Sequence, residues 1–313
     1  MFKQIFDWTS PAGKKARLSI LIFHRVLPAA DPLFPNEMQA NHFDEICGWL
    51  KTWFNVLPLD QAVNRLKSGT LPARAACITF DDGYADNFHV ALPILQRHGL
   101  SATFFIATGF LDGGRMWNDT IVESIRACTQ AELDLSSLGL GAHALDTVAK
   151  RQVAIAALIG QIKYRSIQER LEATEHIARL AGVSPPNNLM MTSQEVKAMR
   201  QAGMQIGAHT VSHPILARLT DDEAREEILA SKNGLEQILA ERVGLFAYPN
   251  GKPGEDYSAQ SVAVVRSLGF DAAVSTTWGF TTSEDDCFQI RRFTPWDKTR
   301  LRFGIRLLAN LRR

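Results

Sequence analysis

The sequence predicts an α/β fold built on a mostly parallel sheet that is either open or closed into a barrel. Short apolar runs alternate along the chain with segments of helical periodicity, a pattern typical of parallel strands joined by crossover helices. The predicted strands are almost continuously apolar, as expected for strands buried on both faces. With 313 residues, 46% of them hydrophobic, the chain has room for one large domain or two medium ones.

Seven apolar runs are predicted to be strands, and helical patterns lie between them. The predicted strands are 18–23, 54–57, 76–80, 102–107, 204–208, 244–248 and 272–275. The main predicted helices are 42–52, 86–98, 194–202, 221–239 and 257–268. Two of the helices begin with capping boxes, Thr192 with Glu195 and Thr220 with Glu223, which fixes their starts.

One long segment interrupts this alternation. Residues 112–191 contain no convincing strand and read as helical in three pieces, 118–128, 144–159 and 166–181. A segment of this length without its own structure is uncommon in a compact domain. We therefore expect a helical insertion that caps the domain.

Composition excludes several classes of protein. The net charge is +1, from 34 basic and 33 acidic residues, so binding to nucleic acid through overall charge is not expected. The four cysteines form no CxxC pair and read as buried apolar residues of a reducing compartment. The first apolar run, 18–23, is too short for a signal peptide or a membrane span. The predicted location is cytoplasmic.

Two adjacent acids follow the predicted strand 76–80. Asp81 and Asp82 precede Gly83, whose conformational freedom permits a sharp turn. Functional groups gather at the carboxyl ends of parallel strands, and a buried acid pair requires a cation or a proton. The alternative interpretation is a solvated turn or a helix N-cap.

Two histidines follow the predicted strand 204–208. His209 and His213 are four residues apart, and on one helical turn both rings would point the same way. With Asp82 they would give a metal two nitrogens and one oxygen and leave a position for water, which is a catalytic ligand set. Two ordinary histidines without a ligand are the alternative. A third strand end carries Pro249-Asn250-Gly251, a turn that can also direct a backbone N–H at an oxyanion.

Together these motifs resemble those of a known family. In order, TFDDGY, HTVSH and FAYPNG look like the first three motifs of the polysaccharide deacetylases (carbohydrate esterase family 4, the NodB-homology domain). The resemblance covers residues 18–110 and 192–295. It implies a distorted (β/α)7 barrel with a helical insertion and a divalent metal, most often zinc. The implied catalytic domain is 15–297, which includes the insertion 112–191.

The resemblance also implies roles for individual residues. Asp81 would be the base that takes a proton from a metal-bound water, and Asp82, His209 and His213 would hold the metal. The backbone N–H of Asn250 would stabilise the oxyanion. Around this centre Tyr84, Trp117 and Pro249 are candidates for binding the sugar, and packing within the insertion is the alternative for Trp117.

The chain departs from the family pattern at two places. The arginine that usually orients the base is replaced by Ala247, and no histidine follows residue 213, so the usual general acid is missing. His24, at the end of the first strand, is a candidate for the acid. Water or Asp81 could otherwise protonate the amine, or the protein could bind glycans without turnover.

The last segment, 298–313, has a distinct composition. It contains six cations and no acid, and Leu301, Ile305, Leu308 and Leu311 recur at helical spacing. A basic amphipathic helix of this kind suits the anionic inner face of a membrane. A helix that packs its apolar side on the barrel is the alternative.

The leading hypothesis is a metal-dependent hydrolase that removes an N-acetyl group from an amino sugar, polymeric or lipid-linked, during polysaccharide or glycolipid biosynthesis. The alternatives are removal of a formyl or other acyl group from a lipid-linked amino sugar, and a metal-containing glycan-binding protein without catalysis. A purely structural metal site is a weaker third hypothesis.

Overall fold

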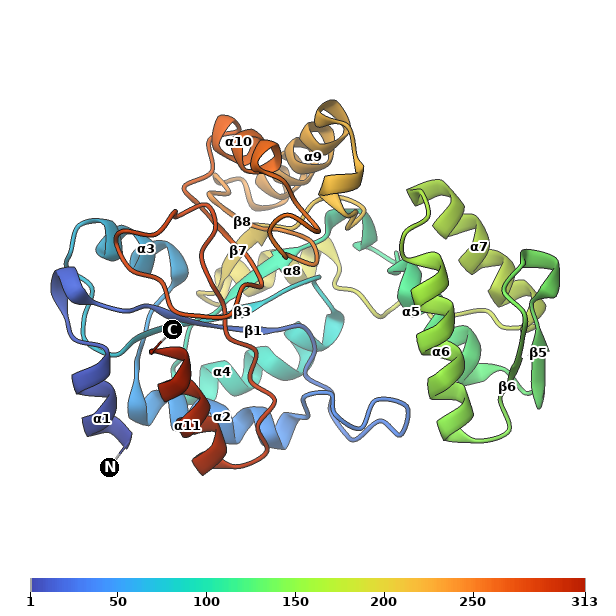
Figure 1. The fold of residues 1–313 in the computed structure, drawn as a ribbon, viewed down its shortest axis with the longest axis horizontal. Helices are drawn as coiled ribbons and strands as arrows, with labels where there is room; N and C mark the ends of the chain where they lie inside the picture. The colour runs from blue at the N-terminus through green and yellow to red at the C-terminus, as the bar shows by residue number, and fades with distance from the viewer. Residues whose placement is uncertain (1, 313) are drawn as a thin grey trace. The chain divides into compact units, whose positions relative to one another are not determined.

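The computed structural model describes residues 2–312 and divides them into two compact units (Figure 1). The first unit comprises 2–29, 38–111 and 191–312. The second comprises 30–37 and 112–190. No helix within 2–312 combines the length and the apolar character needed to cross a membrane.

The first unit is built on a curled parallel sheet. Its strands are β1 (Ser19–Phe23), β2 (Asn55–Val56), β3 (Ala75–Phe80), β4 (Thr103–Ile106), β7 (Gln205–Ala208), β8 (Leu245–Ala247) and β9 (Ala272–Val274). They run in the order β1-β3-β4-β7-β8-β9, and β2 pairs with the start of β3. All seven predicted strands are confirmed, and all pairs between them are parallel.

A short segment near residue 290 joins the two edges of this sheet. Ile290 exchanges backbone hydrogen bonds with β9 through Ala273 and Ser275, and Phe293 does the same with β1 through Ile20 and Ile22. The sheet thereby curls towards the barrel that the NodB-type fold predicts.

Helices surround the sheet (Figure 1). They are α1 (Phe2–Thr9), α2 (Ala40–Trp53), α3 (Leu59–Lys67), α4 (Leu92–His98), α8 (Ser193–Gln201), α9 (Asp221–Leu239), α10 (Ala259–Ser267) and α11 (Arg300–Asn310). The capping boxes predicted at Thr192 and Thr220 are both formed. Helices α1 and α3 were not predicted from the sequence. Pro58, at the N-cap of α3, makes no side-chain capping hydrogen bond that would mark the start of that helix.

Alternate residues of the strands enter two different apolar cores. Phe80, Phe104 and Phe246 belong to the core beneath the surrounding helices. Cys77, Phe105 and Ala247 belong to a second core with α3 and Ile290. This alternation is the period of two expected of strands. Residue 81 lies an even number of positions beyond Cys77, so its side chain is expected on the side of the second, inner core.

The second unit has its own core of helices and a short hairpin. Its elements are α5 (Trp117–Ala127), β5 (Glu132–Asp134), β6 (Ala142–Ala144), α6 (Val148–Ile162) and α7 (Ile167–Leu180). The three predicted helices are present, but the expectation of no strand was wrong, because β5 and β6 pair antiparallel. Three-residue strands are too short to show an alternating pattern. That this unit caps the domain stays a prediction.

Candidate metal centre

The site residues continue the sheet just beyond the ends of its strands. The N–H of Asp81 donates to Phe23 O (3.0 Å), and the N–H of His209 donates to Ile106 O (3.1 Å). Asp82 O accepts from Ala107 N (3.2 Å). Because these backbones are held by neighbouring strands, side chains from β3 and β7 converge at one edge of the sheet.

Asp82, His209 and His213 form a compact group of ligand atoms. Their donor atoms lie within 4.8 Å of one another. Asp82 Oδ1 is 3.4 Å from Nε2 of each histidine. Ligand atoms of a tetrahedral zinc site with bonds of about 2.1 Å lie about 3.4 Å apart, so the spacing fits such an ion.

The hydrogen bonding around these atoms also fits a cation. Asp82 Oδ1 is buried and has no hydrogen-bond partner among the described residues, an arrangement that costs free energy unless a cation satisfies it. His209 Nδ1 donates to the carbonyl oxygen of Ala247 at 2.7 Å. Because a carbonyl only accepts, the neutral ring carries its proton on Nδ1, which leaves the lone pair of Nε2 for a metal, and the carbonyl fixes the ring's orientation.

Electrostatics within the group favour the ligand forms of two residues. Burial would raise the pKa of Asp82, but the neighbouring imidazoles outweigh it and hold that pKa below its ordinary value. Burial lowers the pKa of His213 to about 4. An ionised Asp82 and a neutral His213 are the forms that bind a metal.

The histidine loop does not have the helical turn that the spacing suggested. Residues 209–213 are not helical, and Thr210 (φ 65°) and His213 (φ 51°) have left-handed backbones. Glu227 of α9 holds this loop by accepting hydrogen bonds from Val211 N and Ser212 N, each 2.9 Å, and from Ser212 Oγ at 2.6 Å. The two rings converge through this loop, with centroids 4.9 Å apart.

Strained backbone is concentrated at the site. Besides Thr210 and His213, Asp82 (φ 76°) and Asn250 (φ 57°) have positive φ. Non-glycine residues adopt this region seldom, and they retain it where the surrounding structure imposes it. Four of the seven such residues described belong to the three strand-end motifs, so this edge of the sheet is the candidate functional site.

Asp81 is held by an arginine that the sequence analysis did not identify. Arg292 donates from Nη1 to Asp81 Oδ1 and from Nη2 to Asp81 Oδ2, each at 2.7 Å. Its Nε donates to Ser275 O (2.8 Å) and its Nη1 also to Thr79 Oγ1 (3.2 Å). Arg292 is only 1% exposed.

This ion pair sets the charge and direction of Asp81. Burial alone would raise the pKa of Asp81, but the charge of Arg292 outweighs it and keeps that pKa below its ordinary value. The two-point contact also fixes the plane of the carboxylate. A signal was present in the sequence, since Arg292 is in phase with Ile290 on an apolar segment and therefore points to the inner core.

The remaining predicted residues lie in different settings. His24 is exposed and directly follows β1. Because Phe23 pairs with Phe80 across the sheet and accepts a hydrogen bond from Asp81 N, His24 follows β1 at the strand end where Asp81 follows β3. Asn250 is half-buried and Pro249 is buried. Tyr84 is buried, with the guanidinium of Arg25 4.5 Å from its ring centre. Trp117 is 7% exposed in the core of the second unit.

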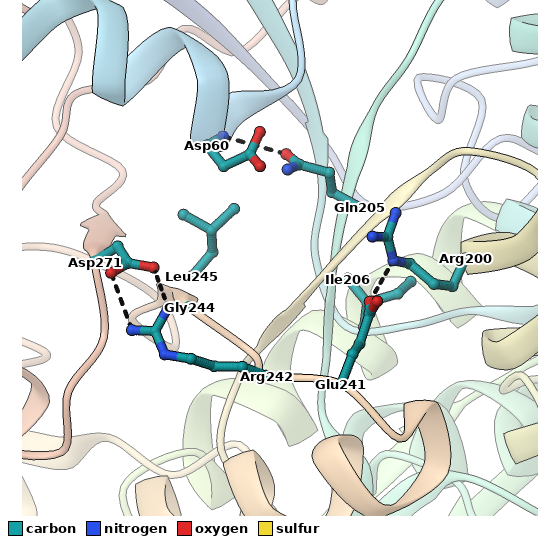
Figure 2. A pocket seen from close by; sticks show the side chains of 9 residues that line it. All are labelled: Asp60, Arg200, Gln205, Ile206, Glu241, Arg242, Gly244, Leu245 and Asp271. Carbon is teal, nitrogen blue, oxygen red and sulfur yellow. Dashed lines mark hydrogen bonds and ion pairs between the residues drawn. The ribbon is translucent and has the colours of Figure 1, made fainter.

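A polar recess, separate from the metal centre, lies at the other end of the strands, where β7 and β8 begin (Figure 2). It has a volume of about 180 Å³ and is lined by residues at the starts of β7 and β8. Figure 2 shows that its charged groups pair with one another, Arg242 with Asp271 and Arg200 with Glu241. Because these charges are already compensated, the recess is a weaker candidate site than the metal centre.

Comparisons with known proteins identify the family of this chain. The sequence model of the family described as polysaccharide deacetylase matches residues 68–273. YxkH of Bacillus subtilis (strain 168), whose name places it among the polysaccharide deacetylases, is 20% identical over 281 residues, 89% of this chain and 71% of YxkH.

Two solved structures share the fold. The deacetylase PplD of Streptococcus pyogenes has a TM-score of 0.60 at 20% identity, over 89% of this chain and 92% of PplD. IcaB of Ammonifex degensii has a TM-score of 0.60 at 16% identity, over 97% of this chain and 99% of IcaB.

The fold and the match to the family's sequence model define a class of protein, the carbohydrate deacetylases. These are hydrolases that act on amide C–N bonds. This chain belongs to the polysaccharide deacetylase family.

Proposed function

We propose that this protein is a metal-dependent N-deacetylase of an amino sugar. The observation that carries the proposal is the juxtaposition of a cation-sized Asp82–His209–His213 group with an ionised, oriented Asp81. A divalent cation such as Zn²⁺ bound by those three side chains would act as a Lewis acid on the amide carbonyl and on water. Sugars of polysaccharide or glycolipid biosynthesis are the proposed substrates.

Asp81 is the proposed general base. Its carboxylate accepts a proton from the water whose oxygen attacks the acyl carbon, while Arg292 keeps it ionised and aimed. The backbone N–H of Asn250 makes no hydrogen bond within residues 2–312, which supports its use as a donor to the oxyanion. The C–N bond then breaks as the amine nitrogen takes up a proton, and the acyl group is released as a carboxylate.

His24 is the proposed source of that proton. Two neighbouring residues fix the chain that carries it, because Asn87 Nδ2 donates to His24 O (2.9 Å) and Asp86 Oδ1 accepts from Val26 N (3.0 Å). Arg25 Nε also donates to Asp86 Oδ2 at 2.8 Å. The ring is therefore anchored at its backbone and exposed to solvent, a suitable arrangement for an acid that must be reprotonated.

Arg292 also bears on the alternative of glycan binding without catalysis. That alternative depended on Ala247, which replaces the usual base-orienting arginine, and on the missing late histidine. In the proposed mechanism Arg292 orients the base from another segment, so the replacement at Ala247 is compatible with catalysis.

The test is acid release from N-acetylated and N-formylated amino-sugar oligomers by the zinc-loaded full chain. Acetate is the expected product, and the related protein PplD is in complex with acetate. Asp81→Asn is expected to lower the rate by about 10²- to 10⁴-fold with metal still bound. Asp222→Asn, an exposed acid on α9, is the matched control. An active Asp81→Asn variant would contradict the mechanism, and glycan binding without any acid released would favour the non-catalytic alternative.

A further inference from the structure

Helix α11 has apolar residues on two opposite sides. The inner side is packed, since Phe303, Leu307 and Leu311 are fully buried. Helix α11 lies beside α1 (Figure 1), and a Cβ added to Gly304 would come within 2.6 Å of the Phe2 ring. The packing of this helix on the first unit, which was the alternative interpretation, is therefore present, and it uses only one side of the helix.

The outer side exposes large apolar groups. Leu301 is 58% exposed and Ile305 is 53% exposed, and residues four apart lie on the same face of a helix. Trp296, just before the helix, is 67% exposed. Of the four large apolar side chains that the described part of the first unit exposes, only Trp8 lies elsewhere in the sequence. Single exposed apolar residues are ordinary, but a cluster marks an interaction surface.

Cations surround this cluster. Residues 298–312 contain five cations and no acid. Arg306 pairs with Asp297 and lies 5.2 Å from the centre of the Trp296 ring. Arg302 and Arg312 are exposed, and no carboxylate of residues 2–312 forms an ion pair with either of them. Arg313, which belongs to the predicted helix, lies outside the described residues.

We propose that this outer face, formed by Trp296, Leu301, Ile305, Arg302 and Arg312, binds the surface of an anionic lipid bilayer. The aliphatic side chains would enter the boundary between headgroups and acyl chains, and the arginines would contact lipid phosphates. Tryptophan is enriched at that depth of a membrane. The same face is poorly suited to a second copy of the chain, because two such faces would bring arginines together without acids.

The proposal does not depend on the deacetylase chemistry. It is tested by sedimentation of the full chain with vesicles of phosphatidylcholine alone or with about one third phosphatidylglycerol. Binding is expected to the anionic vesicles and not to the neutral ones. The double variants Leu301→Ser/Ile305→Ser and Arg302→Gln/Arg312→Gln are each expected to bind at least tenfold more weakly.

Matched controls make the result specific. Val153→Ser removes an apolar side chain that is 70% exposed in the second unit, and Arg225→Gln removes an exposed arginine of α9; both should bind like the wild type. Thermal unfolding checks that each variant is folded, and acid release from a soluble substrate should be unchanged. Equal binding by wild type and both double variants, or no vesicle binding at all, would overturn the proposal. A dimer that the serine variant abolishes would also overturn it.

Discussion

Arg292 holds both carboxylate oxygens of Asp81 from a position 211 residues further along the chain. In the family pattern an arginine near residue 247 performs this task. Here Ala247 is a small residue of the inner core, and Arg292 enters the same core from the segment that joins β9 to β1. A different segment of the chain thus supplies an arginine to Asp81, in place of the one that the family motif would carry near residue 247.

The first prediction concerns this ion pair. Arg292→Lys keeps the charge but loses the two-point contact, so kcat should fall about 10- to 100-fold, whereas KM should change little. Arg292→Met leaves Asp81 buried without a partner and should cost about 3–5 kcal/mol of unfolding free energy. Steady-state kinetics and denaturant unfolding measure these effects.

Arg242→Lys is the control for that experiment. Arg242 also contacts both oxygens of a carboxylate, that of Asp271, but both side chains are about half exposed. Exposed pairs contribute little to stability, so this variant should resemble the wild type. If Arg292→Lys were equally harmless, Arg292 would not orient the base.

The second prediction concerns the histidine loop. In Glu227→Gln an NH₂ group replaces one of the two carboxylate oxygens, of which Oε2 accepts from Val211 N and Ser212 N, and Oε1 accepts from Ser212 Oγ. The loop should then be held less firmly, and His213 should be less well placed. Metal affinity should fall about 10- to 100-fold, as it does when residues that support metal ligands are changed. Competition titration with a zinc indicator measures the affinity. Glu226→Gln, the exposed neighbour, should bind metal normally, and equal affinity in both variants would refute the role of Glu227.

The third prediction concerns the proton donor. His24→Asn should lower kcat without loss of metal, and Asn87→Ala should lower it through the backbone of His24. If Asn87 acts through His24, adding Asn87→Ala to His24→Asn should have little further effect, which is the signature of coupled residues in a double-mutant cycle. Fully additive losses would separate the two residues. His89→Asn, an exposed histidine paired with Glu195, is the control.

The fourth prediction compares two glycines. A Cβ on Gly109 would lie 2.8 Å from Val211 O, within the histidine loop, so Gly109→Ala should displace that loop and weaken metal binding. A Cβ on Gly160 of α6 would meet nothing within 4 Å, so Gly160→Ala should stabilise its helix by about 0.5–1 kcal/mol. Metal titration and thermal unfolding distinguish the two. Normal metal binding by Gly109→Ala would show that the loop tolerates the displacement.

Much of this architecture could be predicted from local patterns. The apolar runs located all seven strands. Six of them are almost entirely buried, and a strand buried on both faces leaves a strong signal, whereas the two-residue β2 is partly exposed. The positions of Asp81, Asp82, His209 and His213 at strand ends followed from the same reading. Two capping boxes placed the starts of α8 and α9 because their geometry depends on residues three apart.

The rest depended on contacts between distant parts of the chain. The pairing of Arg292 with Asp81 arises from closure of the sheet, which no local pattern contains. The convergence of His209 and His213 was predicted for the wrong reason, because a loop with positive φ values brings them together and not a helical turn. The two sides of α11 likewise could not be separated in the sequence. The helical spacing grouped Leu311 with Leu301 and Ile305, although Leu311 is buried and the other two are exposed.

The central claim is that Asp82, His209 and His213 bind one catalytic cation. Elemental analysis of the purified full chain, before and after reconstitution with zinc, tests it directly in the wild type and in His209→Ala. The account predicts about one divalent ion per wild-type chain and its loss in the variant. A wild-type chain that binds no metal even after reconstitution would contradict the account, and the proposed mechanism with it.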